Sequence, residues 1–159
     1  MSPELDRILC ERYPQIFRFR SLSPTEHSMG RGFAVGGRWF SLVEAACGVI
    51  SSRYLSAERE YRHARQRQVD GDPEVDEFVV EHARRKMLAE QARLPVALRV
   101  KEKFGTLRFF LEGGGERTRA CAEFAEYLSA SICEVCGQPG VTLASGGWMR
   151  TRCEEHAGD

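Results

Sequence analysis

Residues 96–115 read VALRVKEKFGTLRFFLEGGG, and this stretch decides the class of fold. Apolar residues alternate with polar ones on either side of Phe104-Gly105-Thr106, at Val96, Leu98 and Val100 and again at Leu107, Phe109 and Leu111. A period of two residues is typical of a strand with one buried face. A short link that contains glycine joins the two runs, as in a β-hairpin. The stretch therefore predicts an antiparallel hairpin that ends at the glycines 113–115.

Helical periodicity surrounds this hairpin. Apolar spacings of three and four residues predict helices over 3–12, from about 38 to the break at 69–75, over 73–92 and over 116–131. Asp72 is the expected N-cap of the third helix, directly before Pro73. The buried sides of the last two helices are predicted at Phe78, Val79, His82, Met87 and Leu88, and at Ala120, Phe124, Tyr127 and Leu128. The sequence thus predicts an α+β fold, with helices packed on a small antiparallel hairpin.

The last 28 residues contain a candidate metal site. Its ligands follow the pattern C-x2-C…C-x2-H, with Cys133, Cys136, Cys153 and His156. Zinc takes thiolate and imidazole ligands in tetrahedral geometry, and structural zinc sites are closed by four protein ligands. Gly137 follows the second cysteine, where a tight knuckle needs positive φ. We therefore expect a structural zinc ion in a zinc-ribbon or treble-clef-like tail, residues 132–159, packed on an α+β body, residues 1–131.

Two alternatives to a structural zinc are disfavoured by the sequence. A catalytic zinc keeps an open position beside a general base, and no H-x-E partner accompanies these cysteines. Disulfides are the main rival, but the polar, acidic N-terminus lacks the basic start and apolar stretch of a signal peptide. We therefore expect a cytoplasmic protein with reduced thiols. The other cysteines, Cys10, Cys47 and Cys121, are predicted to be small buried apolar residues.

Charge and hydropathy limit the possible partners. The chain of 159 residues carries 23 basic and 23 acidic residues, and its pI is about 6.9. This balance argues against non-specific nucleic-acid binding as the main role, although a local basic patch is still allowed. No apolar run approaches the roughly 20 residues that cross a bilayer, so no membrane partner is expected.

Two local groups of basic residues are candidate binding surfaces. One follows the polar half of the long helix, with Arg53, Arg59, Arg62, Arg65 and Arg67. The other alternates with aromatic residues on the hairpin, with Lys101, Lys103 and Arg108. Basic residues beside aromatic ones can form a stacking surface for nucleic acid. The alternative for both groups is an ordinary solvated face, which Glu58 and Glu60 favour on the helix through ion pairing.

No catalytic set is recognisable. His27, His63 and His82 have no acidic or serine partners at catalytic spacing, and no nucleophile with an adjacent base is identifiable. The glycine-rich loop 29–40 could hold an anion at a helix N-terminus, but it matches neither nucleotide-binding fingerprint. The favoured alternative is a tight loop whose aromatic residues fill the core. The protein is predicted to be non-enzymatic.

Four stretches together resemble a family of small zinc-motif proteins in tailed phages and prophages of Proteobacteria. They are RYPQIF (12–17), GFAVGGRWFSLV (32–43), VKEKFGTLRFFLEGG (100–114), and SICEVCGQPG (131–140) with GGWMRTRCEEHA (146–157). The resemblance covers nearly the whole chain in the same order. The chain departs from the family at 30–34, where relatives often carry further cysteines. The resemblance implies a phage setting and a zinc tail, and no particular reaction.

Three functional hypotheses follow. The first is a non-enzymatic phage protein that binds and modulates a host protein or ribonucleoprotein complex, such as an inhibitor of a CRISPR-type defence system. The second is a nucleic-acid-binding module that uses the Arg53–Arg67 helix face or the Lys101, Lys103 and Arg108 hairpin face. The third is an enzyme, for instance a nuclease, whose site the sequence does not reveal. None of these hypotheses fixes the oligomeric state.

Overall fold

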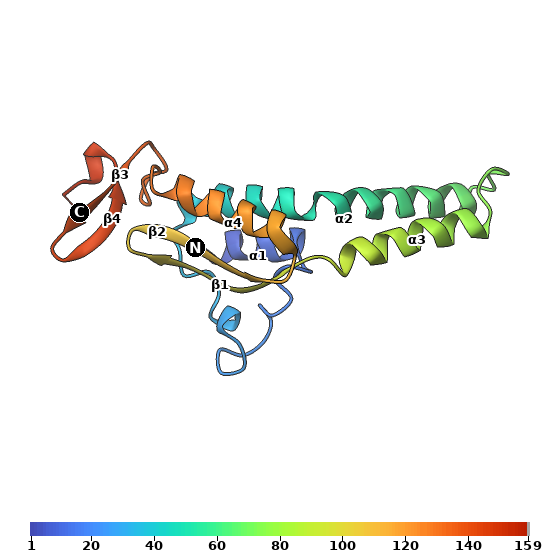
Figure 1. Cartoon of the computed structure of the whole chain (residues 1–159), viewed down its shortest axis with the longest axis horizontal. Coiled ribbons are helices and arrows are strands. Elements are labelled where there is room, and N and C mark those ends of the chain that lie inside the picture. Colours follow the sequence, from blue (N-terminus) through green and yellow to red (C-terminus); the bar gives the residue numbers. More distant parts are fainter. Residues whose placement is uncertain (159) are drawn as a thin grey trace.

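The computed structural model describes residues 1–158, and within them it confirms the α+β prediction (Figure 1). The two strand pairs are both antiparallel, β1 with β2 and β3 with β4. The helices and strands are α1 (Pro3–Arg12), α2 (Phe40–Val69), α3 (Glu77–Gln91), β1 (Val96–Lys103), β2 (Thr106–Glu112), α4 (Gly115–Ser129), β3 (Val141–Ser145) and β4 (Trp148–Arg152).

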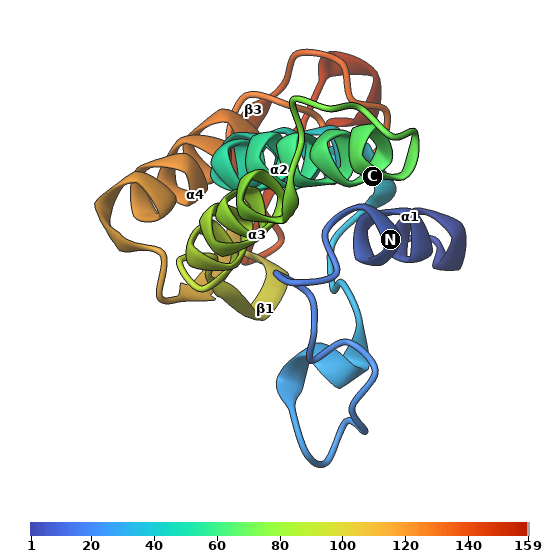
Figure 2. The same ribbon diagram turned by 90° about the vertical axis from the view of Figure 1, so that its right-hand side faces the viewer.

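Helix α2 is the axis of the molecule. Its 30 residues extend over about 45 Å. Figure 2 looks along this axis and shows α4 on one side of α2 and α1 on the other. The second half of α2 packs mainly against α3 and the loop before it, around a small separate core of Ala64, Val75 and Val80. Among residues 1–158, no helix is both long enough and apolar enough to span a membrane.

The main core lies between the first half of α2 and the inner face of the β1–β2 hairpin. Val100 and Leu107 are fully buried there, and Phe109 is almost fully buried. The predicted alternation is therefore confirmed for most of the hairpin. It fails near the start of β1, where a register shift between Ala97 and Arg99 buries Ala97 and leaves Leu98 half-exposed. Such a bulge adds one residue to one strand and changes which side chains face the core.

Both edges of this two-stranded sheet are covered. Along β2, the Leu107 amide donates to Ser129 Oγ at 2.8 Å and the Phe109 amide donates to Glu126 Oε1 at 2.6 Å, both from α4. Along β1, the Ala34 amide donates to the Val100 carbonyl at 3.0 Å. An uncovered edge would leave backbone donors and acceptors without partners. Side chains of α4 and the loop before α2 therefore complete a sheet that has only two strands.

The predicted start of α3 was wrong. The helix begins at Glu77, and its N-cap is Asp76, whose side chain accepts a hydrogen bond from the Val79 amide at 3.0 Å. Asp72 instead accepts from the Glu74 amide at 2.9 Å and pairs with Arg67 at 2.7 Å. These two contacts hold residues 72–75 in a turn. The helix therefore starts only at the next capping residue.

The predicted buried faces of α3 and α4 were also largely wrong. Phe78, Phe124 and Tyr127 are 70%, 62% and 76% exposed. On α4 the buried positions are Thr118, Ala122, Ala125 and Ser129, and on α3 the buried position is Val80. The buried side chains of α4 are all small, which permits close approach of this helix to its neighbours. Large apolar residues beside the small ones therefore remain at the surface.

Replacement of Ser129 tests how much the covered sheet edge contributes. Ser129→Ala leaves the buried Leu107 amide without its partner, so the free energy of unfolding should fall by about 1–3 kcal/mol. Ser131→Ala is the matched control, because the exposed Ser131 hydroxyl also donates to a carbonyl of α4 but supports no strand. The control should change stability by less than about 0.5 kcal/mol. Equal losses in urea unfolding would refute this role for Ser129.

Candidate metal centre

The structure brings all four predicted ligands together. Cys133 and Cys136 lie on the turn after α4, Cys153 directly follows β4, and His156 ends the 3-10 turn Glu154–His156 that Cys153 precedes. Their ligand atoms all lie within 4.8 Å of one another. Cys136 Sγ is 3.6 Å from Cys153 Sγ, and Cys133 Sγ is 3.9 Å from His156 Nδ1. Ligands around one tetrahedral zinc ion stand roughly 3.5–3.8 Å apart, given its usual bond lengths. The cluster can therefore hold a metal ion with four protein ligands.

Local backbone geometry shapes the first half of the cluster. Gly137 has φ 82°, and its amide donates to the Cys133 carbonyl at 2.8 Å. The Cys133 amide donates in turn to the Gln138 carbonyl at 2.8 Å. These contacts close the tight knuckle that the glycine after the second cysteine predicts. The two sulfur atoms of the C-x2-C pair consequently face the same point.

Backbone amides prepare Cys133 for metal binding. Burial of this thiol opposes its ionisation, but amides of Cys136, Cys153 and Val135 donate to the sulfur, and together they lower its pKa to about 6. Metals bind the thiolate rather than the thiol. Outside the cluster, burial is the main cause and the charge of Asp6 the second cause that raise the pKa of Cys10 to about 12. Burial also raises the pKa of Cys47 well above its usual value. Those two thiols are poor ligands by comparison.

Three hydrogen bonds join the tail to parts of the body that are distant in the sequence. The Trp39 indole N–H donates to the Ile132 carbonyl at 3.1 Å, and Arg38 Nε donates to the Val135 carbonyl at 3.0 Å. The Thr151 hydroxyl donates to the Gly105 carbonyl at 2.5 Å, at the tip of the β1–β2 hairpin. Trp39 is buried, as the core interpretation of loop 29–40 predicts. Its second role, as an anchor of the metal knuckle, was not predicted from the sequence.

The hairpin of the tail positions the second pair of ligands. Strands β3 and β4 pair in register around Gly146 and Gly147, both of which have positive φ. This matches the expected short strands around the two glycines. An added Cβ on Gly140 would lie 2.8 Å from the Arg152 carbonyl oxygen, so position 140 lies too close to β4 for a residue larger than glycine. Arg152 also forms an ion pair with Glu134 of the knuckle.

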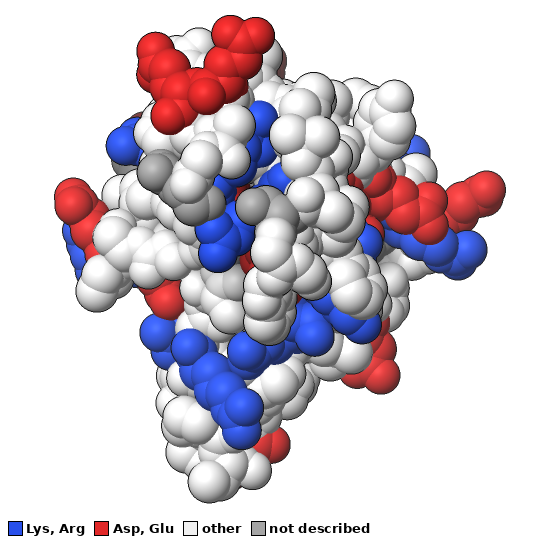
Figure 3. All heavy atoms as spheres, turned by 90° about the vertical axis from the view of Figure 1, so that its left-hand side faces the viewer, with Lys and Arg blue, Asp and Glu red and all other residues white. Residues whose placement is uncertain are grey.

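The hairpin group of basic residues lies on one face of β1–β2. Lys101 pairs with Arg108 and Lys103 with Thr106 in the strand register, opposite the face that buries Val100 and Phe109. Arg108 also donates to the Leu107 carbonyl at 2.8 Å and lies 3.8 Å from Glu126, which reduces its availability. Figure 3 looks onto the end of the molecule that carries the tail and the tip of β1–β2, and it shows Lys and Arg side chains in a band across its lower half.

The helix group does not form one basic face. Its members follow α2 at intervals that place them all around the helix, because successive residues turn by about 100°. Arg62 pairs with Glu58 at 3.0 Å, and Arg67 pairs with Asp72 at 2.7 Å and with Glu74 at 3.3 Å. Arg53, Arg59 and Arg65 are exposed. The stretch therefore matches the solvated alternative better than a binding surface.

The chain matches no protein-family model, no curated protein and no solved structure. Membership of the phage family consequently stays a prediction, as does the division of the chain after residue 131.

Substitution of Gly105 tests how closely the tail packs on the hairpin tip. Gly105 has φ 75°, and an added Cβ would lie 2.9–3.0 Å from backbone atoms of Arg150. Gly71→Ala is the control, because Gly71 has φ 77° but no atom within 4 Å of the added Cβ. The control should lose about 1–2 kcal/mol from the backbone conformation alone. Gly105→Ala should lose clearly more in thermal or urea unfolding, and an equal loss would contradict the close packing.

Proposed function

We propose that Cys133, Cys136, Cys153 and His156 hold one structural zinc ion. Three thiolates and one imidazole are typical of structural zinc sites, and four protein ligands leave no open position for a substrate. A cytoplasmic location would keep these thiols reduced and available to the metal. The ion would supply folding free energy that the short tail lacks, because metal binding and folding of such segments are coupled.

Removal of one ligand tests the zinc assignment. Cys153→Ser should lower the metal content from about one ion per chain to far below one, and the segment after Ser131 should lose its protection against hydrogen exchange. Cys121→Ser is the control, since Cys121 is half-buried on α4, away from the cluster. Elemental analysis and hydrogen exchange measure the two effects. A Cys153→Ser protein with full metal content and an unchanged melting temperature would contradict the assignment.

We also propose that the protein is a non-enzymatic binding module for nucleic acid. The observation that carries this proposal is the outer face of β1–β2, where Lys101 Nζ lies 5.8 Å from the Phe110 ring centre and Lys103 Nζ lies 4.9 Å from that of Phe104. Phe104 and Phe110 are 62% and 44% exposed. Exposed rings with cations beside them offer stacking for bases and charge for phosphates. Within residues 1–158 neither lysine belongs to an ion pair.

This surface is compatible with the phage hypothesis. A host ribonucleoprotein, such as a CRISPR-type complex, contains nucleic acid that a small basic and aromatic face could contact. A modulator of such a complex needs no reaction of its own. The phage setting is supported by the sequence resemblance alone, and the nucleic-acid surface does not depend on it.

Charge removal on the hairpin tests nucleic-acid binding. The double variant Lys101→Gln and Lys103→Gln should weaken binding of a single-stranded oligonucleotide and reduce the slope of log K against log salt by about 0.7 per lysine. Lys86→Gln is the control, because Lys86 carries the same charge on α3 and pairs with Glu60 at 2.5 Å. Fluorescence anisotropy over a range of salt concentrations measures both quantities. An effect no larger than that of Lys86→Gln would contradict the proposal.

A further inference from the structure

The tip of the β1–β2 hairpin, Phe104-Gly105, lies against strand β4 near Arg150 and Thr151, and a groove runs beside this contact toward the Gly146-Gly147 turn that precedes β4. The groove has a volume of about 750 Å³. Its lining includes Glu102, Lys103, Phe104, Glu134 and Trp148. The hydrogen bond from Thr151 to Gly105 holds β4 against the tip of β1–β2, and the groove has walls from both, so it exists only when the tail is docked on the body.

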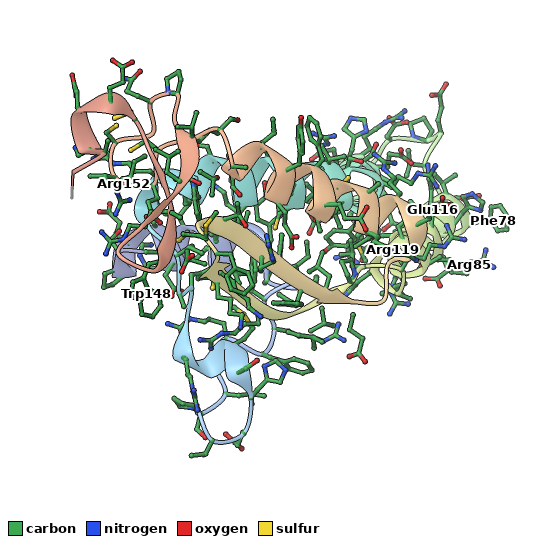
Figure 4. All side chains as sticks on the ribbon, turned by 60° about the vertical axis from the view of Figure 1, so that its left-hand side comes forward. Phe78, Arg85, Glu116, Arg119, Trp148 and Arg152 are labelled. Carbon is green, nitrogen blue, oxygen red and sulfur yellow. The ribbon has the colours of Figure 1, made fainter. Side chains whose placement is uncertain are left out.

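Two large aromatic side chains of this groove take no part in the core. Trp148 is 73% exposed and Phe104 is 62% exposed. Figure 4 shows Trp148 at the end of the tail hairpin that lies beside the tip of β1–β2. Phe104 has φ 56° and is the one described residue other than glycine with positive φ. A bulky residue is unfavourable in that conformation, and asparagine or glycine is usual at such a turn. Strained residues of this kind cluster at binding sites.

Lys103 is a basic group of the groove that can contact an anionic ligand. The two acidic residues of the groove already have partners inside the protein: Glu102 Oε1 accepts from the Gly105 amide at 2.6 Å, and Glu134 pairs with Arg152. Lys103 stands over the Phe104 ring and faces no carboxylate among residues 1–158 at ion-pair distance. Aromatic faces beside a lysine suit a ligand that is both planar and negatively charged.

We propose that this groove binds single-stranded nucleic acid by stacking unpaired bases on Trp148 and Phe104, with Lys103 and Lys101 at the phosphates. The inference rests on the nucleic-acid function proposed above and adds the site and the strandedness. Bases in a duplex are stacked on each other, so only unpaired bases can present a face to these rings. The metal ligands themselves would not contact the nucleic acid, and the tail would contribute Trp148.

The test uses the zinc-loaded full chain and oligothymidylate of about ten nucleotides, within the usual range of site sizes. The chain has two tryptophans, and Trp39 is buried, so quenching of the exposed Trp148 emission reports stacking directly. Trp148→Ala should weaken binding roughly 5- to 150-fold, and Trp148→Phe should restore most of it. Phe78→Ala, an equally exposed aromatic on the distant α3, should leave affinity unchanged. Melting temperature and metal content verify that each variant is folded.

Abasic and duplex probes separate this site from simple phosphate binding. An abasic oligomer of the same length should bind wild-type protein at least as weakly as oligothymidylate binds Trp148→Ala, because it loses stacking on both rings. Equal affinity of the wild-type protein for the abasic, duplex and single-stranded probes would overturn the stacking site. A loss of affinity in the Lys101 and Lys103 double variant would still support the proposed nucleic-acid function. No binding of any probe at low salt would overturn both the stacking site and the proposed nucleic-acid function. The affinity for oligouridylate of equal length, compared with that for oligothymidylate, decides between RNA and DNA. Binding of either probe that depends on Trp148 supports the site.

Discussion

Convergence of three cysteine sulfurs and one histidine nitrogen on one point is the constraint on which the rest of the tail depends. Among the side chains that the structure describes in residues 132–158, only Cys133 and Thr151 are buried. Such a segment has almost no apolar core of its own, and burial of apolar surface is the main favourable term in folding. The main core of the body, by contrast, contains Trp39, Leu9, Ile16 and many other buried residues. A bound metal would compensate for this difference.

The metal centre and the candidate binding surface are mechanically connected. The C-x2-C turn is held by Trp39 and Arg38, and β4 is held by the tip of β1–β2 through Thr151. The same strand β4 begins with Trp148. A change in the ligands would therefore release one wall of the groove, although no ligand lines it. A bound metal would thus affect the proposed binding site at a distance, through the position of a hairpin.

Local patterns in the sequence predicted much of this structure, and long-range packing accounts for what they missed. The ligand spacing and the alternation of residues 96–111 depend on neighbours in the chain, and the structure agrees with both apart from the bulge near Ala97. The predictions of the buried faces of α3 and α4 were wrong because Phe78, Phe124 and Tyr127 are large residues of the kind usually found in a core. In the structure these three are exposed, and small neighbours such as Ala122 are buried instead. Trp39 lies 93 positions from its partner Ile132, so no local pattern reveals that anchor. The groove likewise requires Phe104 and Trp148 to meet through the docked tail.

The most direct test of the central claim is hydrogen exchange of the knuckle amides of Cys133 and Gly137 during zinc titration of the metal-stripped chain. In the folded tail these amides donate to the carbonyls of Gln138 and Cys133. If the metal holds the tail together, both amides should exchange rapidly in the stripped protein and become protected at one equivalent of zinc, while core amides such as that of Val100 stay protected throughout. Full protection of the two knuckle amides before any zinc is added would contradict the account, because the tail would then fold without its metal.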